Sequence, residues 1–466
     1  MTTAKSCLPI QTAFSSHMKP LMTAGDLVIA MIAELESRGL PSVYLRNYEK
    51  LPNEVGNDVD LLVPYGKRNA AADILEKAAG DHGWKKLGRA HFSPLAVYFA
   101  NVNTAETLHL DLFDRLEWHF IEFADASKIL ARRAFNGLVH IPMVEDEIYL
   151  NLATRLIYQG KIREKHRQQV REFIRDKGDD SVRTSFTDHL GAAGAALAES
   201  LAHEQWRASP ALRRSLLRVA VRHHGIWRPW RVAVGARRYC LRILRKIVKP
   251  PGHFIVLEGA DGVGKSTVLE AILPWLSEWC AGRDPYDFHW KPDRLHSSSH
   301  RQNPPVDPRG KKPRSALASI AYLAFHVLGF WWGWLFRIRP LLAKSHPVVG
   351  DRYSYDLFLD PKRFRLNLPD GLCCFASLLT PKPHLTLALL ADPEVVHARK
   401  PELSVAEIYA YQNRWRSLAN GQATMVSVSA DGAPEDVILR IKRAIIGWVI
   451  RENLPHEKSI FSVAQL

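Results

Sequence analysis

A short glycine-rich stretch, GADGVGKST, offers the clearest chemistry in this 466-residue chain. It matches the spacing G-x-x-x-x-G-K-S and lies between the apolar runs FIVLE and VLEAILPWL. Glycines let the backbone curl so that several N–H groups point at phosphate oxygens, and the following helix dipole adds to the attraction. We therefore expect an ATP phosphate site formed by Gly259, Ala260, Asp261, Gly262, Val263, Gly264, Lys265, Ser266 and Thr267. Within it, we expect Lys265 to reach the β- and γ-phosphates and Ser266 to ligate Mg²⁺.

Three carboxylates in the first half form a second candidate site. NDVDLLV places Asp58 and Asp60 two residues apart, so both side chains project from one face of a strand. LHLDLF places Asp111 on a later strand, where sheet pairing would bring it beside them. Three carboxylates at a strand edge can bind two Mg²⁺ ions, one activating an attacking oxygen and one holding a triphosphate.

Each candidate site needs a sheet to position it, and the apolar patterning predicts two mixed α/β regions. The first has helical spacing over 25–39 and 67–83, strand-like runs at 41–47, 58–64, 96–102 and 107–113, and mostly helix from 145 to 201. The second has strand-like runs at 254–258, 286–292, 346–353, 384–392 and 423–430, with a helix from Lys265. This spacing predicts a doubly wound parallel sheet for the second region. We expect domains at 22–204 and 251–451, joined by a connector at 205–250.

Composition excludes several classes of protein. Five cysteines without a C-x-x-C pair indicate neither a disulfide framework nor a zinc site. The first twenty residues lack the continuous apolar core of a secretory signal, so we expect a cytoplasmic protein. Of the formal net charge of +15, nearly all the excess lies between Leu201 and Pro250, which holds eleven Arg and two Lys against Glu204 alone.

The connector has three interpretations. Arg214, Arg218 and Arg222 recur every four residues among apolar side chains, and Trp227 and Trp230 follow. A basic amphipathic helix of this kind can lie on an anionic membrane surface or follow nucleic-acid phosphates. The alternative is a solvated linker whose apolar residues pack on a neighbouring domain. Nucleic acid is the least favoured partner, because no recognition motif accompanies the charge.

The uncharged stretch 317–336 is long enough to span a bilayer. A spanning helix would normally place the loop at Gly259 and the residues DRY at Asp351 on opposite faces of the membrane, so they could not share a site. His326, Gly329 and Gly333 also interrupt it. We therefore expect a buried helix of a large α/β domain.

From about Gly252 to Val449 the sequence resembles the thymidylate kinase family of nucleoside monophosphate kinases. FIVLEGADGVGKST resembles the opening of that family, VVGDRYSYD its Asp-Arg-Tyr signature, and PHLTLALLADPEV followed by HARK the strand that leads into its lid. The resemblance implies a P-loop NTPase fold and ATP with Mg²⁺ as cofactors. It also implies that Asp261 contacts the acceptor or holds an arginine that does, that Asp351 orders Mg²⁺, and that Arg352 neutralises phosphate charge.

The sequence departs from that family at the acceptor side. The loop has no basic residue after Asp261, so Arg399, or else Lys400, is our candidate for the lid cation. The family's acceptor-phosphate arginine has no clean match, and FHWKPDRL offers only Lys291 or Arg294. A nucleotide and a sugar or glycan intermediate therefore fit equally well as acceptor.

From about Ala24 to Asp114 the order of elements resembles the minimal nucleotidyltransferase superfamily, with a helical tail behind it. The resemblance implies that Asp58 and Asp60 are metal ligands and that Asp111 is the third ligand or a base. The family's Gly-Ser turn, which holds the triphosphate, is absent where LRNYEKLPNEVGN stands, and only Arg46 and Lys50 are there to substitute.

Taken together, we expect an ATP-dependent phosphotransferase fused to a nucleotidyltransferase-like domain, with a homodimer compatible with the sequence. One alternative is an enzyme that uses both sites on a sugar or membrane-linked glycan. The other is a non-catalytic nucleotide-binding protein that assembles at a membrane surface through 205–250.

Overall fold

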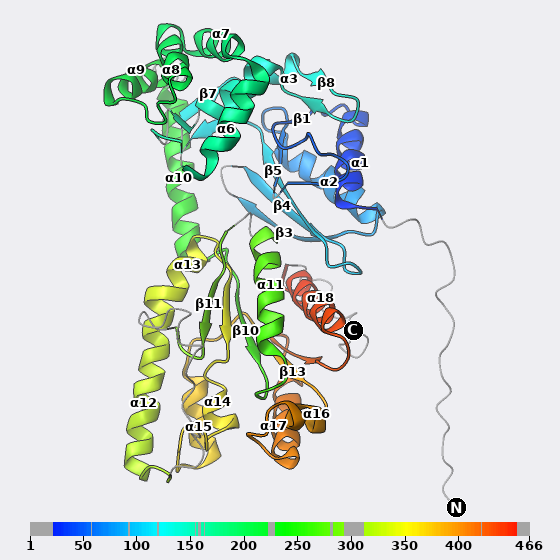
Figure 1. Ribbon diagram of the computed structural model, residues 1–466, viewed down its shortest axis with the longest axis vertical. Helices are drawn as coiled ribbons and strands as arrows, with labels where there is room; N and C mark the ends of the chain where they lie inside the picture. The colour runs from blue at the N-terminus through cyan, green and yellow to red at the C-terminus, as the bar shows by residue number, and fades with distance from the viewer. Residues whose placement is uncertain are drawn as a thin grey trace, which may run out of the picture.

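The computed structural model describes residues 22–453 except 57, 92–93, 119–120, 154, 157–159, 163, 222–228, 280–282, 293–311 and 421. Two sheets lie one above the other along the long axis of the molecule, and a long helix joins them at one side (Figure 1). We describe the two halves in turn.

A five-stranded mixed sheet forms the first half. Its strands run in the order β1 (Val43–Tyr44), β2 (Val59–Leu62), β5 (Thr107–Phe113), β4 (Leu95–Ala100) and β3 (Lys85–His91). Only β2 and β5 are parallel, and the other pairs are antiparallel. Two neighbouring helices, α1 (Ala24–Ser37) and α2 (Arg68–Asp81), bury their apolar residues with those of the sheet. The strand-like runs of this half were thus correctly predicted, whereas β3 was missed because its sequence KKLGRAH has little apolar alternation.

Small hairpins and a helical tail follow. The short strands are β6 (Leu116–Trp118), β7 (Ile121–Ala124), β8 (Ala134–Phe135) and β9 (His140–Ile141), with α3 (Ala126–Ala131) between the pairs. The tail comprises α4 (Val144–Ile148), η1 (Tyr149–Ala153), α6 (Glu164–Lys177), α7 (Asp179–Leu190), α8 (Ala192–Ala202) and α9 (Pro210–Val221). Its apolar residues share one core with Val43, Leu45 and Leu62 of the sheet, so the tail is packed on the first half.

A parallel five-stranded sheet forms the second half, in the order β11 (Tyr286–His289), β12 (Val348–Asp351), β10 (Phe254–Glu258), β13 (Leu385–Leu390) and β14 (Met425–Ser429). The surrounding helices are α11 (Lys265–Trp279), α12 (Ala316–Gly333), η4 (Trp334–Ile338), α13 (Arg339–Ala343), α14 (Asp356–Leu359), α15 (Asp370–Leu378), α16 (Pro393–Arg399), α17 (Val405–Ala419) and α18 (Pro434–Asn453). The prediction of an α/β region with a parallel sheet is confirmed. Because β10 is the central strand, its carboxyl end lies between those of β12 and β13.

The two halves also touch through β3, the end of β4 and the loop between β4 and β5. Leu87, Ala100 and Ala105 belong to the hydrophobic core of the second half. The indole Nε1 of Trp275, on α11, donates to the carbonyl oxygen of Ala105 at 2.9 Å. On α18, Arg443 Nε donates to the carbonyl oxygen of Val102 at 3.2 Å.

The connector and the apolar stretch lie on one side of the molecule. Helix α10 (Pro229–Val248) descends along the left of Figure 1, and α12 continues below it. The prediction that 317–336 is a buried helix was wrong. The helical run Ala316–Ala343 is long and apolar enough to cross a membrane, and only 28% of its most apolar window is buried.

Candidate functional site

The glycine-rich loop follows β10 directly and leads into α11, which begins at Lys265. Gly259, Gly262 and Gly264 have φ angles of +148°, +91° and +100°, which side chains with a Cβ rarely adopt. Among the described residues, no acceptor faces the backbone N–H groups of Gly262 and Gly264. The loop therefore presents free donors at the amino end of a helix, which is the arrangement that binds phosphate.

The Lys265 side chain is buried under this loop. Its Nζ donates to the carbonyl oxygens of Gly259 and Ala260, both at 2.9 Å. Burial, reinforced by the charge of Arg352, lowers the pKa of Lys265 to about 8 despite the nearby carboxylates. Ser266 and Thr267 follow in the first turn of α11 and are exposed.

Asp351 ends the neighbouring strand β12, in register with Leu257 near the end of β10. Its Oδ2 lies 3.0 Å from His289 Nδ1, whereas its Oδ1 is buried without a hydrogen-bond partner. Burial opposes ionisation, but the hydrogen bond from His289 and the charge of Lys265 lower the pKa of Asp351 below its ordinary value. An ionised carboxylate with an unused oxygen fits a divalent cation bound beside Ser266.

Arg352 connects the loop to the elements behind it. The residue is buried at φ +74°, a strained value for a non-glycine residue. Its Nη2 donates to Asp261 Oδ1 at 2.6 Å and its Nη1 to Asp356 Oδ2 at 2.7 Å. Burial opposes ionisation of Asp261, but Arg352, Lys265 and Arg363 together lower its pKa well below the ordinary value.

Three charged residues of this network were missed by sequence reasoning. Arg363 Nη1 donates to the other oxygen of Asp261 at 3.1 Å, so two arginines converge on that carboxylate. Glu258 is fully buried and its Oε1 accepts the N–H of Tyr353 at 2.8 Å. Burial, together with the charge of Asp356, raises the pKa of Glu258 well above its ordinary value. Asp356 was within reach of the sequence, because it follows Arg352 by four residues, but Arg363 and Glu258 carried no local signal.

The candidate lid cation has a neighbour that lies closer to the loop. Arg399 is exposed at the end of α16. Lys400 lies against the loop, because a Cβ built on Gly262 would be 3.1 Å from Lys400 Cβ.

Of the acceptor-side candidates, Lys291 has its ammonium over the ring of Phe325 on α12, 4.7 Å from the centroid, and Arg294 lies outside the described residues.

The three carboxylates of the first half do come together. Asp60 and Asp111 are register partners on the parallel strands β2 and β5. One oxygen of each of Asp58, Asp60 and Asp111 lies within 4.8 Å of the others. This juxtaposition was predicted from the alternation of strand side chains, whereas the role of the three residues as metal ligands stays a prediction.

Arg46 neutralises part of this cluster. Its guanidinium pairs with Asp60, and its Nη2 lies 3.2 Å from Asp58 Oδ2. Burial, helped by the charges of Asp58 and Asp111, raises the pKa of Asp60 to about 6 although Arg46 opposes the shift. The Oδ1 of Asp60 is buried without a partner, which leaves one oxygen for a cation. Arg46 is held by Asp58 and Asp60, whereas Lys50 makes an exposed pair with Glu54 at 2.7 Å, so their role as substitutes for the Gly-Ser turn stays a prediction.

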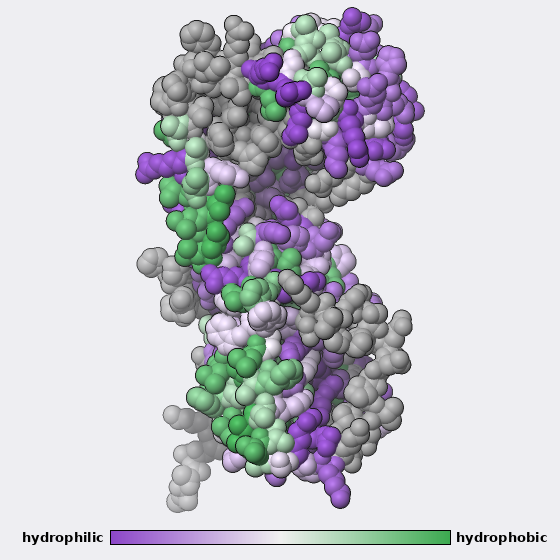
Figure 2. All heavy atoms as spheres, turned by 90° about the vertical axis from the view of Figure 1, so that its left-hand side faces the viewer, coloured by the Kyte–Doolittle hydropathy of each residue, from purple (hydrophilic) through white to green (hydrophobic). Residues whose placement is uncertain are grey.

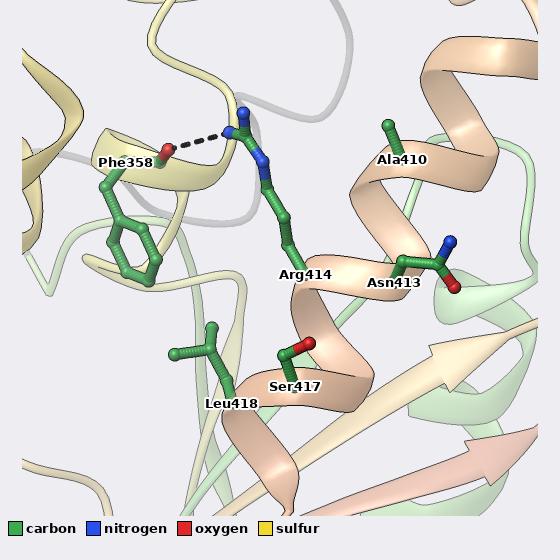
Figure 3. Close-up of a pocket in the computed structure, with 6 residues that line it drawn as sticks. All are labelled: Phe358, Ala410, Asn413, Arg414, Ser417 and Leu418. Carbon is green, nitrogen blue, oxygen red and sulfur yellow. Dashed lines mark hydrogen bonds between the residues drawn. The ribbon is translucent and has the colours of Figure 1, made fainter.

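An open pocket of about 400 Å³ lies elsewhere, between α14 and α17, where Phe358 faces Leu418 (Figure 3). Arg414 crosses it, and its Nη1 donates to the carbonyl oxygen of Phe358 at 3.4 Å. None of the glycine-rich loop residues lines this pocket, so we do not assign it to the phosphate chemistry.

Comparison with known proteins gives a partial similarity. No protein-family model matches the chain. Over 108 residues, 22% of the chain, the sequence is 32% identical to the thymidylate kinase of Chromohalobacter salexigens, and the chain spans 46% of that protein. The crystal structure of thymidylate kinase from Ehrlichia chaffeensis aligns over its whole length with 42% of the chain, at 16% identity and a TM-score of 0.31. Similarity to thymidylate kinases thus extends over part of this chain only.

Proposed function

We propose that the second half is an ATP-dependent kinase of the P-loop type. The observation that carries the proposal is the convergence of the Lys265 loop, Asp351 and the Asp261–Arg352 pair at the carboxyl ends of adjacent parallel strands. Phosphoryl transfer is catalysed mainly by positioning and by stabilising charge, and these residues supply both. The partial sequence similarity to a thymidylate kinase supports the same reaction class.

Different residues would bind the phosphates of ATP, the magnesium ion and the acceptor. The loop N–H groups and Lys265 would hold the phosphates of ATP, and Ser266 and Asp351 would hold Mg²⁺, which supplies charge neutralisation when bound. Arg352 is fixed by Asp261 and Asp356, so its position does not depend on substrate. Arg363 shares Asp261 but is partly exposed, so it can turn toward an acceptor phosphate. We propose that the acceptor is a nucleoside monophosphate or a sugar or glycan intermediate.

Labelled ATP tests the kinase. The protein is incubated with γ-labelled ATP, Mg²⁺ and a panel of nucleoside monophosphates, sugars, sugar phosphates and lipid-linked sugars. Lys265→Ala is expected to lower the rate of γ-label transfer at least about a thousandfold, because the charge nearest the transferred group is lost. Lys344→Ala, which changes an exposed lysine of the same domain, is the matched control. Undiminished transfer by Lys265→Ala would refute the kinase, and ATP binding without any product would favour a non-catalytic nucleotide-binding protein.

We propose nucleotidyl transfer as a second activity, carried by the first half. The supporting observation is the unpartnered buried oxygen of Asp60 inside the Asp58–Asp60–Asp111 cluster. Here α-labelled ATP, CTP, GTP and UTP are the probes, incubated with the same acceptor panel, because an acceptor oxygen must attack the α-phosphorus and displace pyrophosphate. Asp111→Asn is expected to abolish transfer of the α-label while γ-transfer continues, and Asp81→Asn, an exposed carboxylate of the same half, is the control. If α-transfer survives Asp111→Asn, the cluster is not its site.

A further inference from the structure

Helix α12 has an apolar side that no other described part of the chain covers. Its inward residues, such as His326 and Phe330, are buried against the domain. The outward residues recur at helical spacing and are all apolar, with exposed fractions reaching 78% at Leu317, 69% at Leu328 and 64% at Trp332. A helix on the surface of a soluble domain normally turns charged or polar residues outward. An uninterrupted apolar exterior therefore marks a contact surface.

Helix α15 widens this surface. It packs beside α12, and the indole Nε1 of Trp331 donates to the carbonyl oxygen of Leu379, just after α15, at 2.8 Å. The exposed apolar residues here are Leu372, Phe375, Leu378 and Leu379. Figure 2 shows the resulting hydrophobic area on the lower part of the side that faces the viewer.

A second hydrophobic area lies on the same side, over α10 (Figure 2). Its exposed apolar residues are Val234, Leu241, Ile243, Leu244, Ile247 and Val248. By helical spacing, Arg238 and Arg245 of this helix lie beside the apolar residues, Arg237 lies among them, and Lys249 follows the helix directly. We refer to the exposed apolar residues of α10, α12 and α15 together as the lateral face.

The segments that carry most of the lateral face contain no acid. Asp and Glu are absent from 205–257 and from 308–350, whereas these segments contain thirteen and seven Lys or Arg residues. Asp370, at the start of α15, is paired with Arg414 at 3.6 Å. The segments that carry most of the lateral face thus have a positive formal charge.

We propose that the lateral face docks on the surface of an anionic lipid bilayer. Two apolar areas on one side of an elongated molecule can both be covered by a flat interface, with the aromatic rings of α12 in the boundary region and the basic side chains at the headgroups. A second copy of the chain fits less well, because a two-fold contact would bring one acid-free segment against another. A transmembrane span also fits less well, because α12 is packed along its inward side on the catalytic domain through Trp290 and Tyr353.

Vesicle flotation of the full-length protein tests this docking and requires no turnover. The wild type is mixed with vesicles of phosphatidylcholine alone or of phosphatidylcholine with phosphatidylglycerol. We expect flotation with the phosphatidylglycerol vesicles and weaker flotation in high salt, which screens the basic residues. Leu328→Gln/Trp332→Gln and Arg245→Gln/Lys249→Gln are each expected to reduce binding about tenfold or more. The control Phe135→Gln/Tyr409→Gln changes equally exposed apolar residues away from the lateral face and should float like the wild type.

Any of four results would overturn the proposal. The first is a wild type that floats with neither vesicle, and the second is a control that loses flotation as the lateral-face variants do. The third is bound protein that alkaline carbonate fails to release, which would assign α12 as a span. Circular dichroism confirms that each variant is folded, and light scattering after gel filtration would reveal a dimer lost in Leu328→Gln/Trp332→Gln, which assigns the face to a second copy.

Discussion

Most buried charged side chains beside the loop are paired with side chains of opposite charge. Arg352 lies between Asp261 and Asp356, and Asp261 also accepts from Arg363. Lys265 is the exception, because its ammonium is bonded to carbonyl oxygens and its nearest carboxylate oxygen, on Asp261, is 3.8 Å away. An incoming phosphate would supply the negative charge that this lysine lacks.

ATP binding is therefore expected to be coupled to protonation of Lys265. Without ligand its pKa is about 8, and bound phosphate must raise it, because the anion favours the charged form. Above pH 8 the protein must take up a proton to bind ATP, so affinity should fall by up to about tenfold per pH unit between the pKa of the free lysine and the higher pKa of the ATP-bound lysine. Titration calorimetry in buffers of different ionisation enthalpy measures this uptake. Lys265→Arg, which cannot be deprotonated, should bind without it; equal uptake by that variant would contradict the assignment.

The two arginines on Asp261 should differ in their contribution to stability. Asp261→Asn leaves the buried Arg352 with one carboxylate partner and is expected to lower the free energy of unfolding by about 3 kcal/mol. Arg363→Gln removes a partly exposed partner and should cost about 1 kcal/mol or less. Urea unfolding at pH 7 measures both. A larger loss for Arg363→Gln than for Asp261→Asn would show that the buried pair is not the main support.

Sequence reasoning singled out Lys265, Asp261, Asp351 and Arg352 because each belongs to a contiguous motif, and the structure brings them together, whereas their roles stay predictions. It placed Asp111 beside Asp58 and Asp60 because alternation along strands determines which side chains share a face. It missed Arg363 and Glu258, whose partners are about a hundred residues away, since nothing local indicates which distant charge a buried group will meet.

At the scale of elements, the loop is held between β10 and the segment that follows α16. Gly262 approaches Val396 and Lys400, whereas a Cβ on Gly264 would meet no atom within 4 Å. Both glycines have positive φ angles, so alanine is strained at either position by about 1–2 kcal/mol.

Substituting each of these two glycines tests a different effect, one on packing and the other on ligand binding. Gly262→Ala adds a contact at 3.1 Å to the strain and should destabilise the domain more than Gly264→Ala. Gly264→Ala puts a methyl group into the open space of the loop and should weaken ATP binding more than its effect on stability explains. Thermal unfolding with and without ATP measures both quantities. Equal responses of the two variants would mean that the loop is not clamped by the segment after α16.

The apolar pattern of 317–336 predicted a helix, but it did not indicate which side of that helix packs on the rest of the domain. The stretch is apolar all round, which is typical of a fully buried helix, and the error arose because burial depends on neighbours that the pattern does not specify. The central strands β10 and β13 of the second half were easier to predict, since each is a short apolar run buried on both faces.

On the scale of the whole molecule, the β4–β5 loop links the two candidate sites. β5 carries Asp111, and the loop before it contacts α11, the helix that begins at Lys265. No sequence pattern predicted this contact, because its hydrogen bonds go to backbone carbonyl oxygens and its apolar residues, Leu87, Ala100 and Ala105, are far in sequence from the core that they join.

If this contact is lost, binding of ATP to the second half should no longer slow hydrogen exchange in the first half. Trp275→Phe leaves the Ala105 carbonyl oxygen without its indole donor, and Arg443→Ala removes the donor to Val102. Each change is expected to cost about 1–2 kcal/mol at the interface.

Hydrogen exchange with a non-hydrolysable ATP analogue is the measurement. In the wild type, the analogue should slow exchange in 101–106 as well as in α11, because the loop is held by the liganded domain. In Trp275→Phe/Arg443→Ala, protection should remain in α11 and disappear from 101–106, whereas Arg440→Ala, on the same helix but bonded within its own half, should behave as the wild type. Protection of 101–106 that survives in the double variant would show that the halves communicate by another route.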